Sequence, residues 1–437
     1  MPSLKFIAPT CLAIGLVFAA FAPASAQLPS SDSLAELQSR VRAYENAIAE
    51  LDGSYNQTST ELFLSLADAQ LQLGRLDESS YAYREALQSL RINEGLAGES
   101  QLRMLDEFNK LLFRKRDWEQ IDVNMHLAED ITRRLYGMED ERYIGAATAL
   151  ANWKIRAYQA GAYRETGDSS IADAAEIYRS LLQQLPQTAE NQRRRADYLW
   201  AQGLAYFYSA QYTAGVPVEE FRHAVPESGG YQTCVPILLS VDRGAQRSAS
   251  ACNVNQTDPE FYAAQQREKN NTVRRHLSNM RQSFLEAITA VEASPDATLR
   301  DRAIALLNFG DANLLAEDYS RARIQYRRVW EMLGDDDESR ALREELMGRP
   351  ARALVGILAE LPGDPRIRGE GSPLGNVSFD VTETGEIVNI DIQGSAAALA
   401  QDNLGAIAIR LDQSVYRPRI EAGRPVTSRV NMDAAEL

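Results

Sequence analysis

Two stretches of the chain, 60–92 and 303–335, share a spacing of small and large residues that is typical of tightly packed helix pairs. In the second stretch, Gly310 and Ala322 are small enough to let two antiparallel helices approach closely, and Tyr326 fills the space to the next pair. The residues that carry the pattern are Leu66, Ala67, Tyr83 and Ala86 in the first stretch, and Phe309, Gly310, Tyr319, Ala322 and Tyr326 in the second. Each stretch is therefore predicted to be a helix–turn–helix.

Both stretches resemble tetratricopeptide (TPR) repeats, which are helix pairs of about 34 residues. Weaker helical periodicity continues through 105–128, 153–185, 199–206, 260–293 and 338–361. We therefore predict a mainly α fold, with a TPR-like helical-pair solenoid over 27–361 and an insertion near 225–258. A generic helical bundle is the alternative. The resemblance implies a concave face that binds extended peptides or partner helices.

The periodicity changes after a linker predicted at 362–374. Two segments alternate between apolar and polar residues, as half-buried strands do, and Thr384 and Gly385 supply the turn between them. The apolar faces are Val377, Phe379 and Val381 in the first strand, and Val388, Ile390 and Ile392 in the second. An Ala- and Leu-rich segment at 399–411 is predicted to be helical. A small α+β domain is therefore expected at 375–437.

This domain resembles the C-terminal domain of TonB, which couples the inner membrane to outer-membrane transporters. The matching residues are Gly375, Gly385, Tyr416, Arg417, Pro418, Gly423 and Pro425. The resemblance implies a three-stranded antiparallel sheet with helical packing on one face. It also implies a sheet edge that pairs with an extended segment of a transporter. That edge would be formed by Val426, Thr427, Ser428, Arg429 and Val430. In the alternative interpretation, the domain only packs against the helices.

The N-terminus has the pattern of a cleavable export signal. Lys5 precedes an apolar run at 6–21, and small residues at Ala24 and Ala26 form a cleavage site before Gln27. We expect a signal peptide at 1–26, a periplasmic mature protein in a Gram-negative cell envelope, and no integral membrane span after cleavage. An uncleaved N-terminal anchor is the alternative.

Two cysteines remain after the predicted cleavage, Cys234 and Cys252. Disulfides persist in an oxidising exported compartment, so we predict that these cysteines form one. The bridge would close a loop of about 17 residues and contribute about 3 kcal/mol on the chain-entropy model. Two separate buried thiols are the alternative.

Charge and motifs argue against nucleic-acid binding and catalysis. The net charge of −15 would repel phosphate backbones. His126, His223 and His276 do not fall in a metal-ligand or catalytic spacing, and no cofactor or metal is expected. The acidic run 335–338 is interpreted as a helix-capping turn, and the basic run 193–195 as a solvated helix face. The sequence predicts an exported, non-enzymatic scaffold or adaptor. The alternative is a component of TonB-type energy-coupled transport that engages an outer-membrane transporter.

Overall fold

The structure is a computed structural model that describes residues 31–51, 53, 55–159, 170–215, 232–239, 247–254, 259–353, 376–393, 411 and 415–433. These residues are mainly helical, with a small sheet region towards the C-terminus, as predicted. The chain divides into two compact units, Met1–Thr166 with Leu358–Arg368, and Gly167–Ile357 with Gly369–Leu437. The predicted signal peptide, the linker, Gly375, most of the helix at 399–411 and much of the predicted insertion lie outside the described residues.

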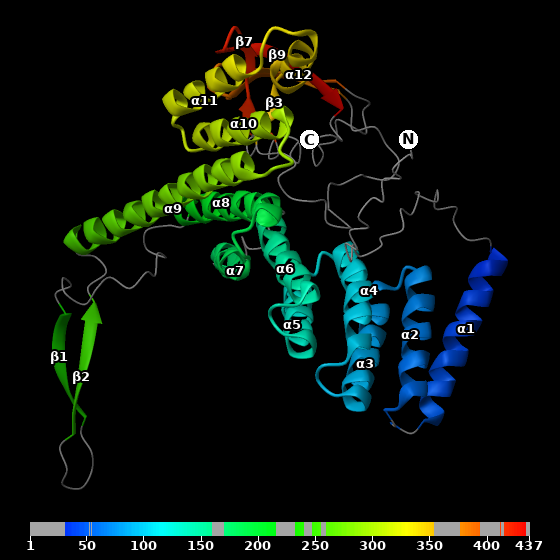
Figure 1. Cartoon of the computed structure of the whole chain (residues 1–437). Coiled ribbons are helices and arrows are strands. Elements are labelled where there is room, and N and C mark those ends of the chain that lie inside the picture. The colour runs from blue at the N-terminus through cyan, green and yellow to red at the C-terminus, as the bar shows by residue number, and fades with distance from the viewer. Residues whose placement is uncertain are drawn as a thin grey trace, which may run out of the picture. The chain divides into compact units, whose positions relative to one another are not determined.

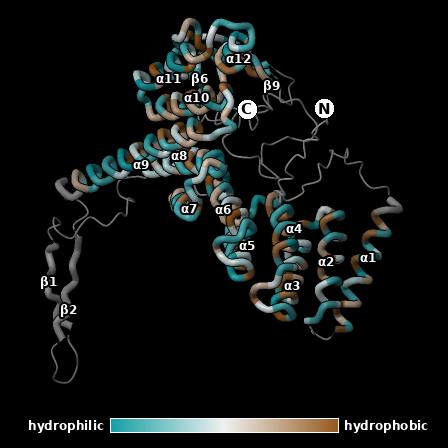
Figure 2. Tube along the Cα trace, viewed as in Figure 1, coloured by the Kyte–Doolittle hydropathy of each residue, from teal (hydrophilic) through white to brown (hydrophobic). Residues whose placement is uncertain are grey.

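The described part of the first unit is a row of helices in which each packs against the next (Figure 1). The helices are α1 (Ser31–Glu50), α2 (Gln57–Gln72), α3 (Leu76–Glu94), α4 (Glu99–Lys115), α5 (Trp118–Tyr136) and α6 (Glu141–Gln159). Hydrophobic and hydrophilic residues alternate along them, as amphipathic helices require (Figure 2). The start of α2 is fixed by a capping box in which the Asn56 side chain accepts a hydrogen bond from the Ser59 amide at 2.9 Å.

Helices α2 and α3 coincide with the first predicted helix pair. Ala67 of α2 and Ala86 of α3 are fully buried, and the two helices pack against each other. Tyr83 stacks on Phe108 of α4 with ring centroids 5.4 Å apart. It therefore fills the space between this pair and the next helix, as predicted.

The second unit contains helices α7 (Ser170–Gln184), α8 (Gln192–Gly215), α9 (Pro259–Ala293), α10 (Leu299–Leu315), α11 (Tyr319–Met332) and α12 (Asp337–Met347), and the 3-10 turn η1 (Ala189–Asn191). Helices α8 and α9 pack along each other, and α7 packs against α8 (Figure 1). Gly203 of α8 permits this approach, because a Cβ there would lie 2.6 Å from the Phe284 ring of α9. Between α8 and α9 in sequence, β1 (Gln232–Leu239) and β2 (Arg247–Val254) form an antiparallel hairpin that the sequence analysis did not predict.

Helices α10 and α11 coincide with the second predicted pair. A Cβ at Gly310 would lie 2.5 Å from the ring of Tyr326, so only glycine leaves room for this tyrosine. Tyr326 thus packs within its own pair, against Gly310 and Asp311 of the facing helix, and its predicted role of filling the space to the next pair stays a prediction.

The C-terminal sheet consists of β4 (Asn376–Val381), β5 (Ile387–Gln393) and β9 (Ser428–Asp433) in the antiparallel order β5-β4-β9. Two smaller pairs accompany it. Strands β7 (Arg419–Glu421) and β8 (Arg424–Val426) form a hairpin, and β3 (Ala351–Arg352) pairs with β6 (Tyr416–Arg417). The predicted closing helices at 338–361 are therefore wrong in part, because α12 ends at Met347 and the chain enters a strand at Ala351.

The predicted apolar face of the second strand is also wrong in part. Asn389 has a φ of 53° and lies where the register between β4 and β5 shifts, which indicates a β-bulge. A bulge inserts one extra residue and reverses the alternation beyond it. Ile387 and Ile392 therefore pack against the sheet core, whereas Val388 and Ile390 are exposed.

Candidate protein-interaction surfaces

The C-terminal sheet has a compact core that holds its strands rigidly. Val377, Phe379 and Val381 on β4 are fully buried. Tyr416 packs edge-on against Phe379 with ring centroids 5.1 Å apart, and its hydroxyl donates to the sulfur of Met432 at 3.7 Å. Tyr416 therefore folds onto the sheet, as the sequence predicts.

Glycines permit the two tight turns of this region. Gly385 has a φ of 82°, and a Cβ there would lie 2.5 Å from the carbonyl oxygen of Tyr416. Gly423 has a φ of 72° in the turn between β7 and β8, beside Ala422 at 47°. Pro418 separates β6 from β7, and Pro425 lies in β8 opposite Ile420.

A buried polar cluster attaches the C-terminal sheet region to α10 and α11. The Asp311 carboxylate lies 3.8 Å from the Arg417 guanidinium and accepts a hydrogen bond from the Tyr326 hydroxyl at 3.0 Å. Burial raises the pKa of Tyr326 well above its usual value, so this hydroxyl stays protonated and donates. The Ala353 amide also donates to the Val415 carbonyl at 2.8 Å. The sheet region is thus docked directly on the helices.

The two outer strands of the C-terminal sheet differ in regularity. Strand β9 pairs with β4 over six residues without a register shift, and no other described strand pairs with its outer side. Strand β5 carries the bulge at Asn389, a feature that discourages further pairing. The regular edge is therefore β9.

The predicted edge residues do not all lie on β9. Val426 belongs to β8, where it pairs with Arg419, and Thr427 lies between the strands. The open edge instead runs from Ser428 to Asp433. On the face of the sheet opposite the apolar core, Arg429 donates to the Asp380 carboxylate of β4 at 3.1 Å and to the Ser378 hydroxyl at 2.9 Å. The amide of Asn389 and this guanidinium hold the pKa of Asp380 below its usual value.

A second surface is an open groove of about 650 Å³ between α7, α8 and α9. Its lining residues come from α8, from α9, and from the C-terminal part of α7 with the residues that follow it. The lining includes Arg195, Leu199, Gln202 and Tyr206 on α8, and Asn279, Gln282, Ser283 and Glu286 on α9.

Hydrogen bonds hold the three helices together beside this groove. Gln202 donates to the Ala175 carbonyl at 3.2 Å and accepts from the Ser283 hydroxyl at 3.1 Å, so it connects all three helices. Arg195 Nη1 donates to the carbonyl oxygens of Leu182 and Leu185 at 3.2 and 3.3 Å, where α7 ends.

Arg179 lies at the other end of the groove from Arg195. It donates to the Tyr206 hydroxyl, an interaction that raises the pKa of Arg179, and it also pairs with Glu176. The sequence analysis missed this groove. The interpretation of the basic run 193–195 as a solvated face was wrong for Arg195, whose side chain caps α7 and lines the groove.

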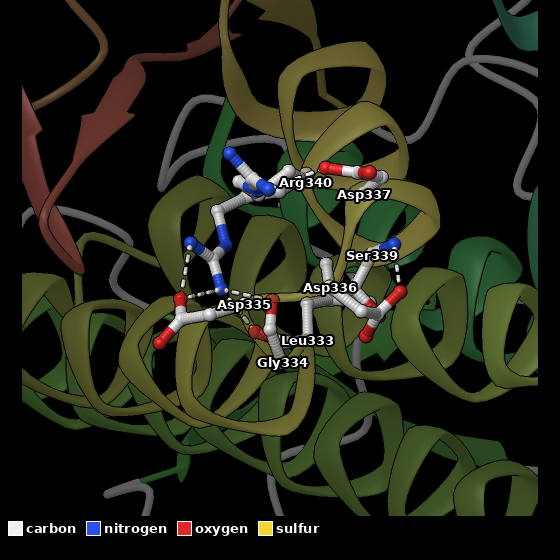
Figure 3. Close-up of polar contacts among 8 residues, drawn as sticks. Leu333, Gly334, Asp335, Asp336, Asp337, Ser339 and Arg340 are labelled. Atoms are coloured by element: carbon white, nitrogen blue, oxygen red, sulfur yellow. Dashed lines mark hydrogen bonds and ion pairs between the residues drawn. The ribbon is translucent and has the colours of Figure 1, made fainter.

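The acidic run 335–338 forms a capping turn (Figure 3). The Asp336 side chain accepts from the Ser339 amide at 2.9 Å, which lowers the pKa of Asp336 and caps α12. Asp337 pairs with Arg340, and Asp335 lies 3.5 Å from the Arg343 guanidinium. The described residues contain no cluster of three or more side chains that could hold a metal ion.

The two cysteines meet in the hairpin register. Cys234 of β1 and Cys252 of β2 are directly opposite each other across the antiparallel ladder. Opposite residues of such a ladder have Cα atoms about 4.5–5.5 Å apart, within the range that a disulfide spans. The backbone register is therefore compatible with the predicted disulfide, which stays a prediction.

Comparisons with known proteins do not assign a family. No family model matches the chain, and no curated protein matches it. Among solved structures, BtubC (BKLC) from P. vanneervenii is similar at 12% identity over 76% of this chain and 100% of that chain, with a TM-score of 0.28. This likeness is too low to support an argument about fold or function. Within the described residues, no helix combines the length and apolar character that crossing a membrane requires.

Proposed function

We propose that this protein is an exported, non-enzymatic adaptor of the cell envelope, which binds one partner along the β9 edge and another on its helices. The observation that carries this proposal is the combination of a regular, open strand and a rigid attachment. Strand β9 offers six residues to an incoming strand, while Arg417 and Asp311 fix the sheet region to the helices. An adaptor needs both a binding surface and a firm connection to the rest of the molecule.

Strand addition explains why an edge of this kind is useful. An incoming extended segment forms main-chain hydrogen bonds with the free N–H and C=O groups of the edge strand, and these bonds supply affinity. An unprotected edge is otherwise an aggregation hazard, and proteins usually blunt it by bulges or charges. Here β5 has the bulge and β9 does not. The resemblances to TPR repeats and to the TonB C-terminal domain favour the same proposal.

In-cell photocrosslinking tests the edge. A benzophenone amino acid replaces Asn431, an exposed residue of β9, and Tyr81 of the first unit, 57% exposed, provides the control position. We expect a crosslinked partner from position 431 that position 81 does not capture. If that partner is an outer-membrane transporter, the alternative function in energy-coupled transport is favoured over a scaffold.

Proline substitutions then show whether main-chain pairing holds this partner. Neighbouring residues of an edge strand direct their N–H groups alternately towards the sheet and outwards. Proline has no N–H, so of Val430→Pro and Asn431→Pro one removes a hydrogen bond within the sheet and the other removes an outward donor that only a partner strand would use. The variant that keeps the wild-type melting temperature removes an outward donor, and it should no longer co-purify with the partner that was captured from position 431. Val430→Ala controls for lost packing. A partner retained by both folded proline variants would contradict strand pairing.

A further inference from the structure

The groove between α7, α8 and α9 has the length of a short extended peptide. Arg195, Leu199, Gln202 and Tyr206 follow one another at intervals of three or four residues, so they form one stripe along α8. The stripe covers eleven residue steps, about 16 Å at the helical rise. An extended chain rises about 3.3 Å per residue, so the stripe matches about five residues.

The polar lining suits peptide groups better than a compact metabolite. Gln183, Gln187, Asn279 and Gln282 line the groove around Gln202, whose own carboxamide is already bonded to Ala175 and Ser283. A carboxamide both donates and accepts hydrogen bonds, as a peptide group does, so a row of them can follow an extended main chain. The groove is also partly open to solvent, whereas small-molecule sites usually enclose most of their ligand.

One cation in the groove has no carboxylate partner. Arg195 uses Nη1 to cap the carbonyl oxygens of α7, and in the described part of the chain no carboxylate forms an ion pair with it. Its remaining N–H groups are available, because a guanidinium has five donors. By contrast, Arg179 pairs with Glu176, and Glu286 accepts from Gln282 at 2.7 Å. The protein as a whole carries a net charge of −15, so this arginine is a local positive charge on an acidic molecule.

We propose that the groove binds an extended peptide segment of about five residues that contains an aspartate or glutamate, whose carboxylate pairs with Arg195. The carboxamides hold the main chain, and the guanidinium fixes the position of the acidic residue. This inference rests on the proposed adaptor function, since it names the chemistry of the helix-bound partner. A segment of a partner protein, and not of this chain, is the occupant.

A peptide selection on the full mature chain tests this assignment. The probe is a phage-displayed library of random heptapeptides, and selected sequences are measured as fluorescein-labelled peptides by anisotropy. We expect an acidic residue at a fixed place in the selected set. Arg195→Gln should weaken binding by about tenfold or more, the magnitude of one hydrogen-bonded charge. Arg195→Lys should retain part of the affinity.

Arg193→Gln is the matched control. Arg193 lies two residues earlier on α8, and its guanidinium lies 3.7 Å from Asp301, so the substitution changes the net charge equally outside the groove. We expect less than a twofold effect. Circular dichroism establishes that each variant retains the wild-type helical content, because Arg195 also caps α7. Peptide affinity should fall as the salt concentration rises. This salt dependence should remain in Arg193→Gln and disappear in Arg195→Gln.

Three outcomes overturn the inference: no selected peptides, selected peptides without a fixed acidic residue, or equal effects of the two arginine substitutions. Binding blocked by a segment of this chain would give the first of these. The crosslink from Asn431 is measured in parallel. If the Asn431 crosslink persists while peptides fail to bind the groove, the groove assignment is wrong and the adaptor function is unaffected. If it is absent while peptides bind, the edge-binding part of the proposed function fails instead.

Discussion

Gly310→Leu should destabilise the second unit strongly. A Cβ at this position would lie 2.5 Å from Cε1 and 2.9 Å from Cδ1 of Tyr326, a side chain that is only 1% exposed. The ring must move, and overpacking of this kind costs about 1–3 kcal/mol. Displacing the ring also breaks the hydrogen bond of the Tyr326 hydroxyl to buried Asp311, and bonds to charged groups contribute about 1.5–3 kcal/mol.

Helix propensity offsets only part of this loss, since leucine is favoured over glycine by about 1 kcal/mol inside a helix. We therefore expect a net loss of about 2–4 kcal/mol, or a fall in melting temperature of about 5–15 °C for a unit of this size. Thermal unfolding monitored by circular dichroism measures it. Gly145→Leu is the control, because Gly145 is an exposed residue of α6 with no atom within 4 Å of its hypothetical Cβ.

The control should be neutral or slightly stabilising, and the double variant Gly310→Leu with Tyr326→Leu should unfold at a higher temperature than Gly310→Leu with an intact tyrosine. An unchanged melting temperature for Gly310→Leu would refute the packing of α10 against α11. A fall of the same size for Gly145→Leu would refute the role assigned to Tyr326.

Three further measurements test other contacts. Burial raises the pKa of Tyr83 to about 12 from 10.0, so the folded state keeps this proton at a pH where the unfolded state loses it. The free energy of unfolding should therefore fall as the pH rises from about 10 to 12. Denaturant titrations over a pH series measure this fall, and Tyr83→Phe should reduce its slope. Arg417→Ala removes the cation that lies 3.8 Å from the buried Asp311 carboxylate and should cost about 1–3 kcal/mol, with Asp311→Asn restoring part of the loss in thermal melts. Alkylation of the unreduced mature protein should label neither Cys234 nor Cys252, and two labelled thiols in the mass spectrum would exclude the disulfide.

The helical part of the fold was predictable because its signals are local. Gly310 and Ala86 are small where helices touch, and that requirement is visible in the spacing of a single pair of helices. The face of β4 was predictable for the same reason, since Val377 and Phe379 alternate with polar residues and are fully buried. Periodicity identifies an element whenever its burial is regular.

The remaining features depend on contacts between segments that are distant in sequence. A bulge at Asn389 reverses the pattern of β5, and alternation alone cannot reveal where an extra residue is inserted. Ala351 and Arg352 form a strand only because residues 416–417 pair with them. Arg195 was interpreted as a solvated residue because a basic run does not show that the end of α7 lies within its reach.

The pairing of β3 with β6 has a mechanical consequence. Strand β3 follows α12 after only three residues, so the sheet region is joined to the helices by main-chain hydrogen bonds as well as by the chain itself. A tensile load applied along β9 therefore passes through β4 to Tyr416, and from the neighbouring Arg417 to Asp311 of α10. A fragment cut at residue 376 would lose both β3 and Asp311, and with them its resistance to such a load.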